Sequence, residues 1–245
     1  MNNLLARHIA EARSALASRR SFNKVFGIGG HKTGTTTLAD VFTLCGLRVG
    51  NQVEGELTSY SARRGDYSKL IAYVQNADAF QDSPFAESEV FIALDALFPN
   101  SRFILTVRDP EDWFRSQMRF TAKRFGLADG NQITKEHIQQ DQYIFRGYCA
   151  EAHAYAFLMR TPDYKFHSSF DVGEDAIEWE KLFNKDEYIR AYLTRNESIR
   201  RFFRGRPHQL LEIDMTTAET IENIAEFLGL PESLSKVPMP HANKT

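Results

Sequence analysis

The pattern of apolar and polar residues predicts strands that alternate with helices. Four short runs have the apolar character of buried strands, at residues 24–28, 79–81, 102–107 and 209–213. The third run, RFILTV, is continuous in the way that parallel sheets favour. Because the segments between these runs carry apolar residues at helical spacing, we predict a three-layer α/β fold. In this fold, helices cover both faces of a parallel sheet of about five strands.

Helices are predicted where apolar residues recur every three or four positions. The segments are 1–20, 35–47, 67–76, 88–98, 111–125, most of 135–160, 186–203 and 217–228. Asp109 can cap the helix at 111–125 and Pro110 can open it. Residues 51–66 are polar and contain two glycines, so we predict an irregular connection there. We find no internal repeat and predict a single domain over residues 1–245, which begins with an amphipathic helix at 1–20.

Composition narrows the class of protein. The chain has 245 residues, of which 42% are hydrophobic, and this is enough for a packed core. A net charge of −2 argues against bulk binding of nucleic acid. Cys45 and Cys149 are too few for a disulfide framework, and no run reaches the ~18 apolar residues of a membrane span. The first twenty residues lack the apolar core of a signal peptide but hold four arginines, which leaves an organelle transit sequence open. We predict a cytoplasmic protein.

The loop between the first strand and its helix carries the most chemistry. It lies within VFGIGGHKTGTTTL at residues 25–38. Glycines let the backbone approach an oxyanion closely, and the N-terminus of the helix offers N–H groups and partial positive charge. Lys32 adds a full charge. The stretch is therefore predicted to be a phosphate cradle.

The position of the lysine narrows the kind of phosphate. Gly29 and Gly34 have the spacing of a nucleotide P-loop, but Thr35 stands where that loop has its lysine and Thr36 where it has its hydroxyl. In a nucleotide triphosphatase, that lysine contacts the β- and γ-phosphates and that hydroxyl binds Mg²⁺. Lys32 lies inside the loop instead, so its charge is not positioned as in a triphosphatase.

A second charged motif follows the strand at 102–107, in RFILTVRDPEDWFRS. This strand brings Arg108 to the carboxyl edge of the sheet, where the loop must also lie. Ser116 follows eight residues later, in the second turn of the next helix. A planar guanidinium and a hydroxyl suit a phosphate group. The alternative is that Arg108 pairs with Asp109 or another neighbour and that Ser116 is a surface residue.

The two motifs resemble those of the sulfotransferases that use 3′-phosphoadenosine-5′-phosphosulfate (PAPS). Their first motif reads roughly P-K-[ST]-G-T-[ST] and appears here as HKTGTTT at 31–37, with His31 in place of the common proline. Their second motif is R-[ND]-P followed by a serine at the spacing seen here. The similarity covers about 24–47, 79–116 and 200–244, which includes a C-terminal PHANK segment. It implies a three-layer fold of the P-loop type.

The resemblance also implies a role for each residue of the two motifs. Lys32 would hold the bridging oxygen between phosphate and sulfate and stabilise its charge during transfer. Arg108 and Ser116 would hold the 3′-phosphate, a group that ATP lacks. The amides and hydroxyls of the loop would cradle the 5′-phosphate. The implied cofactor-binding residues of the loop are His31, Lys32, Thr33, Gly34, Thr35, Thr36 and Thr37. No metal is required.

The acceptor also needs a base. The segment FQDSPF at 80–85 resembles the strand end that carries histidine in the cytosolic branch of the family, and Asp82 is the matching residue. An ordinary carboxyl pKa of ~3.9 is low for a base, so burial would have to raise it, or Asp82 would orient the acceptor. Asp82 could also be a turn former before Pro84. Glu54 and Glu56 are the alternative bases.

The predicted function is transfer of the sulfuryl group from PAPS, which leaves 3′-phosphoadenosine-5′-phosphate (PAP), to a hydroxyl or, less favourably, an amine. The acceptor is a small molecule, glycan or lipid. Residues 124–184 match nothing in the family and are predicted to be a helical insertion that binds it. One alternative is an ATP- and Mg²⁺-dependent P-loop kinase, and another is a non-catalytic relative that binds nucleotide. A homodimer through the N-terminal helix stays open.

Overall fold

The computed structural model describes residues 3–87, 89–144, 148–150, 179–217 and 220–230. They form two compact units. The first takes its residues from Met1–Ala62, Tyr67–Arg108 and Asn196–Thr245, and the second from Arg63–Asp66 and Asp109–Arg195. The first unit contains the sheet.

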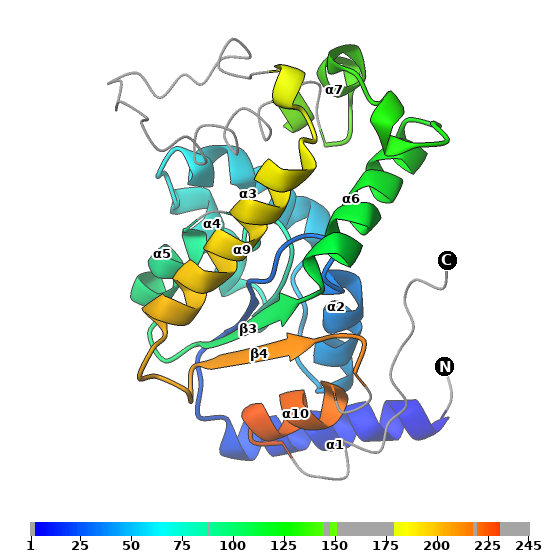
Figure 1. Ribbon diagram of the computed structural model, residues 1–245. Helices are drawn as coiled ribbons and strands as arrows, with labels where there is room; N and C mark the ends of the chain where they lie inside the picture. The colour runs from blue at the N-terminus through cyan, green and yellow to red at the C-terminus, as the bar shows by residue number, and fades with distance from the viewer. Residues whose placement is uncertain (1–2, 88, 145–147, 151–178, 218–219, 231–245) are drawn as a thin grey trace. The chain divides into compact units, whose positions relative to one another are not determined.

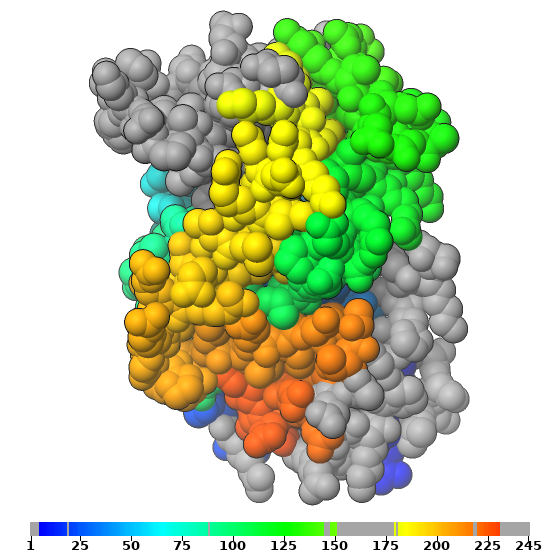
Figure 2. Space-filling model, viewed as in Figure 1, coloured from blue at the N-terminus to red at the C-terminus, as the bar shows by residue number. Residues whose placement is uncertain are grey.

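The sheet is parallel, and its strand order is β2-β1-β3-β4. The strands are β1 (Val25–Gly27), β2 (Ala79–Phe80), β3 (Arg102–Val107) and β4 (Leu210–Asp214). All four apolar runs predicted as strands are therefore confirmed. In the described part of the chain the sheet has four strands, one fewer than the predicted count of about five. β4 pairs with β3 along its whole length and reaches the surface of the first unit, where it is orange in Figure 2.

Helices of the first unit cover both faces of the sheet, which confirms the three layers. On one face lie α3 (Gln52–Arg63), α4 (Ser68–Gln75), α5 (Val90–Leu97) and the end of α9 (Lys185–Phe202). On the other face lie α1 (Asn3–Arg19), α2 (Thr35–Leu44) and α10 (Thr220–Phe227). Figure 1 shows α1 and α10 on one side of β3 and β4, with α4 and α5 on the other.

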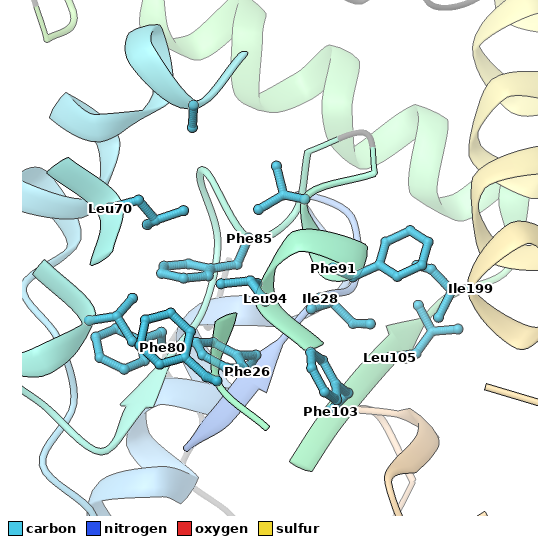
Figure 3. Packing of buried hydrophobic residues seen from close by; sticks show 14 of the residues in the cluster. Phe26, Ile28, Leu70, Phe80, Phe85, Phe91, Leu94, Phe103, Leu105 and Ile199 are labelled. Atoms are coloured by element: carbon cyan, nitrogen blue, oxygen red, sulfur yellow. The ribbon is translucent and has the colours of Figure 1, made fainter. Parts of the chain in front are cut away.

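Aromatic packing fixes the short central strand. The ring of Phe26 in β1 lies 5.7 Å from Phe80, 5.6 Å from Phe85 and 5.5 Å from Phe103, centroid to centroid. All four rings are buried, and Figure 3 shows them in one cluster. Aromatic pairs at this separation add to the stability gained from the buried area. The cluster therefore holds together the three strands whose carboxyl ends carry the charged motifs.

The N-terminal helix packs on its own unit. Ala12 is fully buried, and Leu16 belongs to the same apolar cluster as Val41 and Phe42 of α2. The backbone of Gly46 comes so close to α1 that an added Cβ would lie 2.7 Å from the backbone nitrogen of Arg13. This packing gives the helix a structural role within the chain.

The prediction of an irregular connection at 51–66 is wrong, because the stretch contains α3. Asn51 caps this helix: its Oδ1 accepts a hydrogen bond of 3.1 Å from the backbone N–H of Glu54. The buried side consists of small and polar residues, namely Gly55, Glu56, Thr58, Ser59 and Ala62. Its large apolar residues, Val53, Leu57 and Tyr60, are about half exposed. The apolar spacing therefore does not mark the buried face.

In the second unit, α6 (Pro110–Arg124) begins as predicted. Oδ1 of Asp109 accepts hydrogen bonds of 3.0 Å from the N–H groups of Glu111 and Asp112. Two short 3₁₀ turns, η1 (Gly130–Gln132) and η3 (Trp179–Lys181), and α7 (Lys135–Gln140) follow along the chain. Residues of α6, α7 and η3 contribute to an apolar cluster built around Ile138, Phe183 and Tyr188.

The segment 135–160, which we predict to be mostly helical, is interrupted after α7. α7 stops before Asp141, which adopts an extended backbone and pairs with Arg124. The side chain of Asp141 is buried, so its carboxylate needs this partner, and the extended backbone ends the helix. Residues 148–150 are helical again, and 151–160 lie outside the described residues.

The half-buried carboxylate of Asp78 connects the start of β2 to two other segments. Oδ1 of Asp78 lies 2.8 Å from Nη1 of Arg20, and its Oδ2 lies 3.0 Å from Nε of Arg48. Burial by itself would raise the pKa of Asp78. The hydrogen bonds from Arg48 and Arg20 outweigh this effect and lower the pKa to about 2. Since its pKa in the folded state is below that of the unfolded chain, Asp78 stabilises the fold above pH ~4, and this contribution is lost as the pH falls towards 2.

We therefore expect Asp78→Asn to lower the free energy of unfolding by about 1–2 kcal/mol at pH 7, after allowance for solvent screening around Arg48. The difference should shrink between pH 4 and pH 2. Urea unfolding at pH 7, 5 and 3 measures it, with Asp40→Asn on the exposed side of α2 as the matched control. A difference that is the same at all three pH values would contradict the ion-pair explanation.

Candidate active site

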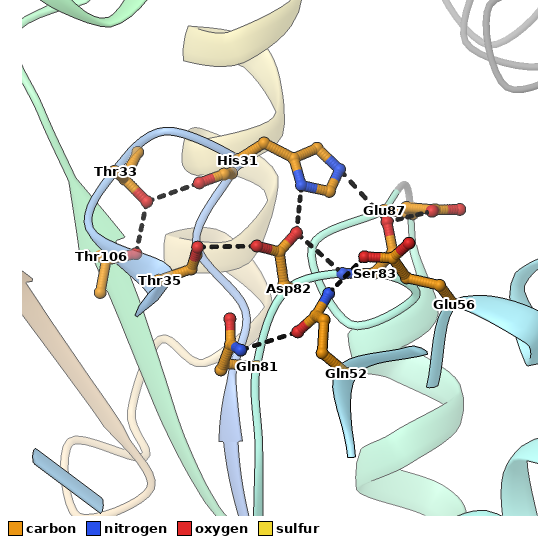
Figure 4. A network of polar contacts seen from close by, with 11 residues as sticks. His31, Thr33, Thr35, Gln52, Glu56, Gln81, Asp82, Ser83, Glu87 and Thr106 are labelled. Atoms are coloured by element: carbon orange, nitrogen blue, oxygen red, sulfur yellow. Dashed lines mark hydrogen bonds and ion pairs between the residues drawn. The ribbon is translucent and has the colours of Figure 1, made fainter. Parts of the chain in front are cut away.

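The candidate site lies at the carboxyl ends of three neighbouring strands in the first unit. The loop at 28–34 follows β1, residues 81–83 follow β2, and Arg108 follows β3. Parallel strands end at the same edge, so side chains far apart in sequence meet there. Figure 4 shows the resulting network of polar contacts.

Two glycines give the loop its course. A Cβ at Gly29 would lie 2.0 Å from Oγ1 and 2.4 Å from the carbonyl oxygen of Thr106 in β3, so only glycine fits against this strand. Gly34 precedes α2 with a φ of 96°, and α2 has no side-chain cap. Lys32, with a φ of 67°, also has a left-handed backbone. The loop therefore leads into a helix N-terminus for whose first N–H groups no side chain among the described residues serves as an acceptor.

Thr33 shapes the loop from inside. Its N–H donates to the carbonyl oxygen of Gly30 at 3.3 Å, and its hydroxyl lies 2.5 Å from that oxygen and 2.5 Å from Oγ1 of Thr106. Both of its donors are used within the protein. Its predicted contact with the 5′-phosphate stays a prediction.

The other threonines divide into two kinds. The hydroxyl of Thr35 donates to Oδ2 of Asp82 at 2.8 Å, so Thr35 links the loop to the segment after β2. Thr36 is exposed and Thr37 is half-buried at the start of α2. Within the described part of the chain, neither of these two hydroxyls has a hydrogen-bond partner. Of the four threonines, Thr36 and Thr37 are thus the ones with a hydroxyl available to an anion.

Nδ1 of His31 contacts Oδ1 of Asp82, and the contact is an ion pair when the ring is protonated. The backbone N–H of Ser83 also donates to Oδ1, at 3.0 Å. Nε2 of His31 lies 3.3 Å from Oγ of Ser83, and that hydroxyl donates to Oε1 of Glu87 at 2.6 Å. The carboxylate, the imidazole and the hydroxyl therefore make one continuous chain of contacts, which Figure 4 shows.

The pair shifts the pKa of both partners. Burial raises the pKa of Asp82, but the charge and hydrogen bond of His31, with hydrogen bonds from Thr35 and Ser83, lower it to about 2. Burial lowers the pKa of His31, and Asp82, followed by Glu87 and Glu56, more than offsets this and raises it. Asp82 is thus a carboxylate at neutral pH, and its pKa moves opposite to the rise that a carboxyl base would need.

Lys32 and Arg108 bring positive charge to the same loop. Nη1 of Arg108 donates to the carbonyl oxygen of Lys32 at 3.4 Å. Burial lowers the pKa of Lys32, Asp82 opposes this effect, and Arg108 adds to it, so the net direction is downward. The two cations predicted from separate motifs therefore lie together at the sheet edge.

α3 supplies a polar layer that the sequence reading missed. Nε2 of Gln81 donates to Oε1 of Gln52 at 2.8 Å, and Nε2 of Gln52 donates to Oε1 of Glu56 at 2.7 Å. Glu56 is 4% exposed and belongs to this network, whereas Glu54 is exposed on α3. The cap at Asn51 was the available signal for this helix. The structure therefore favours Glu56 over Glu54 as a site residue.

The remaining predicted residues lie elsewhere. Ser116 is half-buried in α6, in the second unit, and its partnership with Arg108 stays a prediction. Residues 151–178 of the predicted insertion and the PHANK segment lie outside the described residues. Among the residues that the structure describes, no group of three or more His, Cys, Asp or Glu side chains is arranged to hold a metal ion. None of the described helices is long and apolar enough to cross a membrane.

Comparison with known protein families assigns most of the chain to one of them. Residues 24–245 match the family model described as "Sulfotransferase domain". No curated protein matches the chain. The match begins just before β1 and runs through the residues of both compact units, so it includes the loop, Asp82 and Arg108.

Proposed function

Since the chain belongs to the sulfotransferase family, we propose that it transfers the sulfuryl group of PAPS to a hydroxyl of an acceptor. An amine is the less favoured acceptor group. One observation carries the choice of donor: Lys32 and Arg108, from two separate motifs, meet at the end of the sheet, where Nη1 of Arg108 lies 3.4 Å from the Lys32 carbonyl oxygen. Two cations at one loop suit a donor that is anionic at both its 5′ and its 3′ position.

We propose that the loop holds the 5′-phosphosulfate. The N–H groups at the start of α2 and the hydroxyls of Thr36 and Thr37 are its donors, and Lys32 contributes the full charge. The fit rests on the close packing of Gly29 on β3 and on the uncapped start of α2 after Gly34. Arg108 is proposed to hold the 3′-phosphate, with Ser116 as its partner because their spacing matches the family's second motif.

In the proposed transfer, the acceptor oxygen bonds to sulfur while the bond from sulfur to the bridging oxygen breaks. The bridging oxygen leaves with the electron pair as part of PAP. Lys32 is proposed to donate to that oxygen as its charge grows, an interaction stronger in the transition state than before it. Asp82 lies at the strand end to which the resemblance assigns the base, and its lowered pKa suits a carboxylate that orients rather than one that takes the proton.

The two compact units are proposed to form one sulfotransferase domain, with the residues at 124–184 contacting a small-molecule, glycan or lipid acceptor. The continuous family match through both units supports this.

Both cysteines are free thiols, and burial raises the pKa of Cys45 and of Cys149 to about 12. Free thiols suit the proposed cytoplasmic location. The homodimer stays a prediction.

Calorimetry with PAP and with Mg²⁺-ATP, followed by transfer from ³⁵S-labelled PAPS to a panel of phenols, alcohols, amines and glycans, tests the proposal. We expect PAP to bind at least about tenfold more tightly than ATP, because only PAP carries the 3′-phosphate. Failure to bind PAP would overturn the proposal, and Mg²⁺-dependent turnover of ATP would favour the kinase. Binding of PAP with no transfer to any acceptor would identify a non-catalytic relative.

A further inference from the structure

The contact between His31 and Asp82 changes which group can take the proton of the acceptor. A base for a hydroxyl acceptor works best when its pKa lies near the working pH. The imidazole ring meets this condition, since its ordinary pKa is ~6.5, whereas a carboxyl group needs a large upward shift. Asp82 shows no such shift, because its pKa falls to about 2.

The hydrogen bonds determine which nitrogen of His31 can accept a proton. Nδ1 contacts the carboxylate of Asp82, so the neutral ring carries its hydrogen there and keeps the lone pair on Nε2. Oγ of Ser83, 3.3 Å from Nε2, commits its only hydrogen to Glu87. The serine can therefore accept from a protonated Nε2, but it does not donate to the neutral one.

The imidazole also lies further out than the carboxylate. The side chain of His31 is 44% exposed and that of Asp82 is 23% exposed. Asp82 is held from three sides, by His31, by Thr35 at 2.8 Å and by the N–H of Ser83 at 3.0 Å. An acceptor that approaches the carboxyl end of β2 therefore has better access to the ring than to the carboxylate behind it.

We propose that His31 is the general base of the transfer and that Asp82 is a positioning residue that holds its ring. This inference rests on the proposed function. The acceptor hydroxyl gives its proton to Nε2 of His31 as its oxygen bonds to sulfur and the bridging bond breaks. The electron pair of the broken bond stays on the leaving nucleotide. The imidazolium then releases the proton to water.

The charges around the ring favour this cycle. Asp82 and Glu87 from the segment after β2 and Glu56 from α3 act on His31 and stabilise its protonated form. Lys32 follows His31 in the loop, with Arg108 at its carbonyl oxygen. The net effect of burial and these carboxylates is to raise the pKa of His31. We therefore expect kcat to rise with pH as the His31 ring loses its proton. This titration should appear as the acidic limb of the pH profile.

The test compares variants for kcat, its pH profile and affinity for PAP, with ³⁵S-labelled PAPS and the fastest acceptor of the panel. His31→Asn keeps an amide N–H near the position of Nδ1 but removes Nε2. We expect it to lower kcat by about 10²-fold or more and to keep its affinity for PAP, because the loop backbone is unchanged. His208→Asn, at an exposed position, is the matched control and should match the wild type.

In Asp82→Asn, the pH profile of kcat distinguishes the proposed positioning role from a purely structural one. Loss of the negative charge lowers the pKa of His31, so the acidic limb should shift to lower pH. If His31→Asn is poorly folded by circular dichroism, His31→Ala with added imidazole replaces it, and we expect recovery of activity. A wild-type kcat in His31→Asn, an unmoved limb in Asp82→Asn or no recovery with imidazole each overturn the inference. A wild-type protein that does not bind PAP overturns the proposed function instead.

Discussion

Lys32→Ala should lower kcat for sulfuryl transfer by about 10³-fold, and it should weaken the binding of PAP by no more than about tenfold. The reason is the difference between the two states. The bridging oxygen gains charge only as its bond to sulfur breaks, so the ammonium group stabilises the transition state more than the bound donor. The loop N–H groups at the start of α2 remain to hold the phosphate in the variant.

The left-handed backbone at Lys32 calls for a second variant. With a φ of 67°, alanine at this position is strained and glycine is not. Lys32→Gly should lose kcat as much as Lys32→Ala if the side chain is responsible. Lys69→Ala, on the exposed side of α4, is the control for the loss of a lysine. Equal losses in kcat and in affinity for PAP, or recovery in Lys32→Gly, would contradict the proposed role.

Local signals were enough to predict most of the framework from the sequence. β3 is a continuous apolar run, and Asp109 with Pro110 marks the start of α6. Each of these signals lies within a few residues and reflects one physical cause, burial in a sheet or the capping of free N–H groups.

Prediction from hydrophobic periodicity fails where the buried face of a helix or strand is not apolar. α3 buries Gly55, Glu56 and Ser59 and leaves Leu57 about half exposed. Its buried side is made of small and polar residues, some of which join a polar network while Ala62 packs in the apolar core, so hydrophobic periodicity could not identify it. The missed helix is also the one that brings Gln52 and Glu56 to the site.

Long-range pairing is the other limit. His31 and Asp82 are 51 positions apart, and nothing in either segment indicates the contact. That contact, with the hydrogen bonds from Thr35 and Ser83, lowers the pKa of Asp82, which agrees with the orienting alternative, and it gives the histidine of the loop a carboxylate partner. The sequence therefore predicted the segments that meet at the candidate site, while the contact between these two residues depends on the folded geometry.

Arg108→Ala should remove most of the preference for a nucleotide that carries a 3′-phosphate. We expect the wild type to bind PAP about 10–100-fold more tightly than adenosine 5′-phosphate, since charge-assisted hydrogen bonds contribute about 1.5–3 kcal/mol. The variant should bind the two nucleotides with similar affinity. Calorimetry with both nucleotides measures the ratio, with Arg119→Ala, an exposed arginine on α6, as the control.

Comparing two nucleotides separates recognition of the 3′-phosphate from support of the loop. Arg108 also donates to the carbonyl oxygen of Lys32 at 3.4 Å, so its loss could disturb the cradle. A disturbed cradle would weaken PAP and adenosine 5′-phosphate alike, because both carry the 5′-phosphate. Only loss of a direct contact with the 3′-phosphate weakens PAP alone. Ser116→Ala should reduce the ratio in the same direction by about threefold, because a neutral hydroxyl contributes less than a guanidinium group.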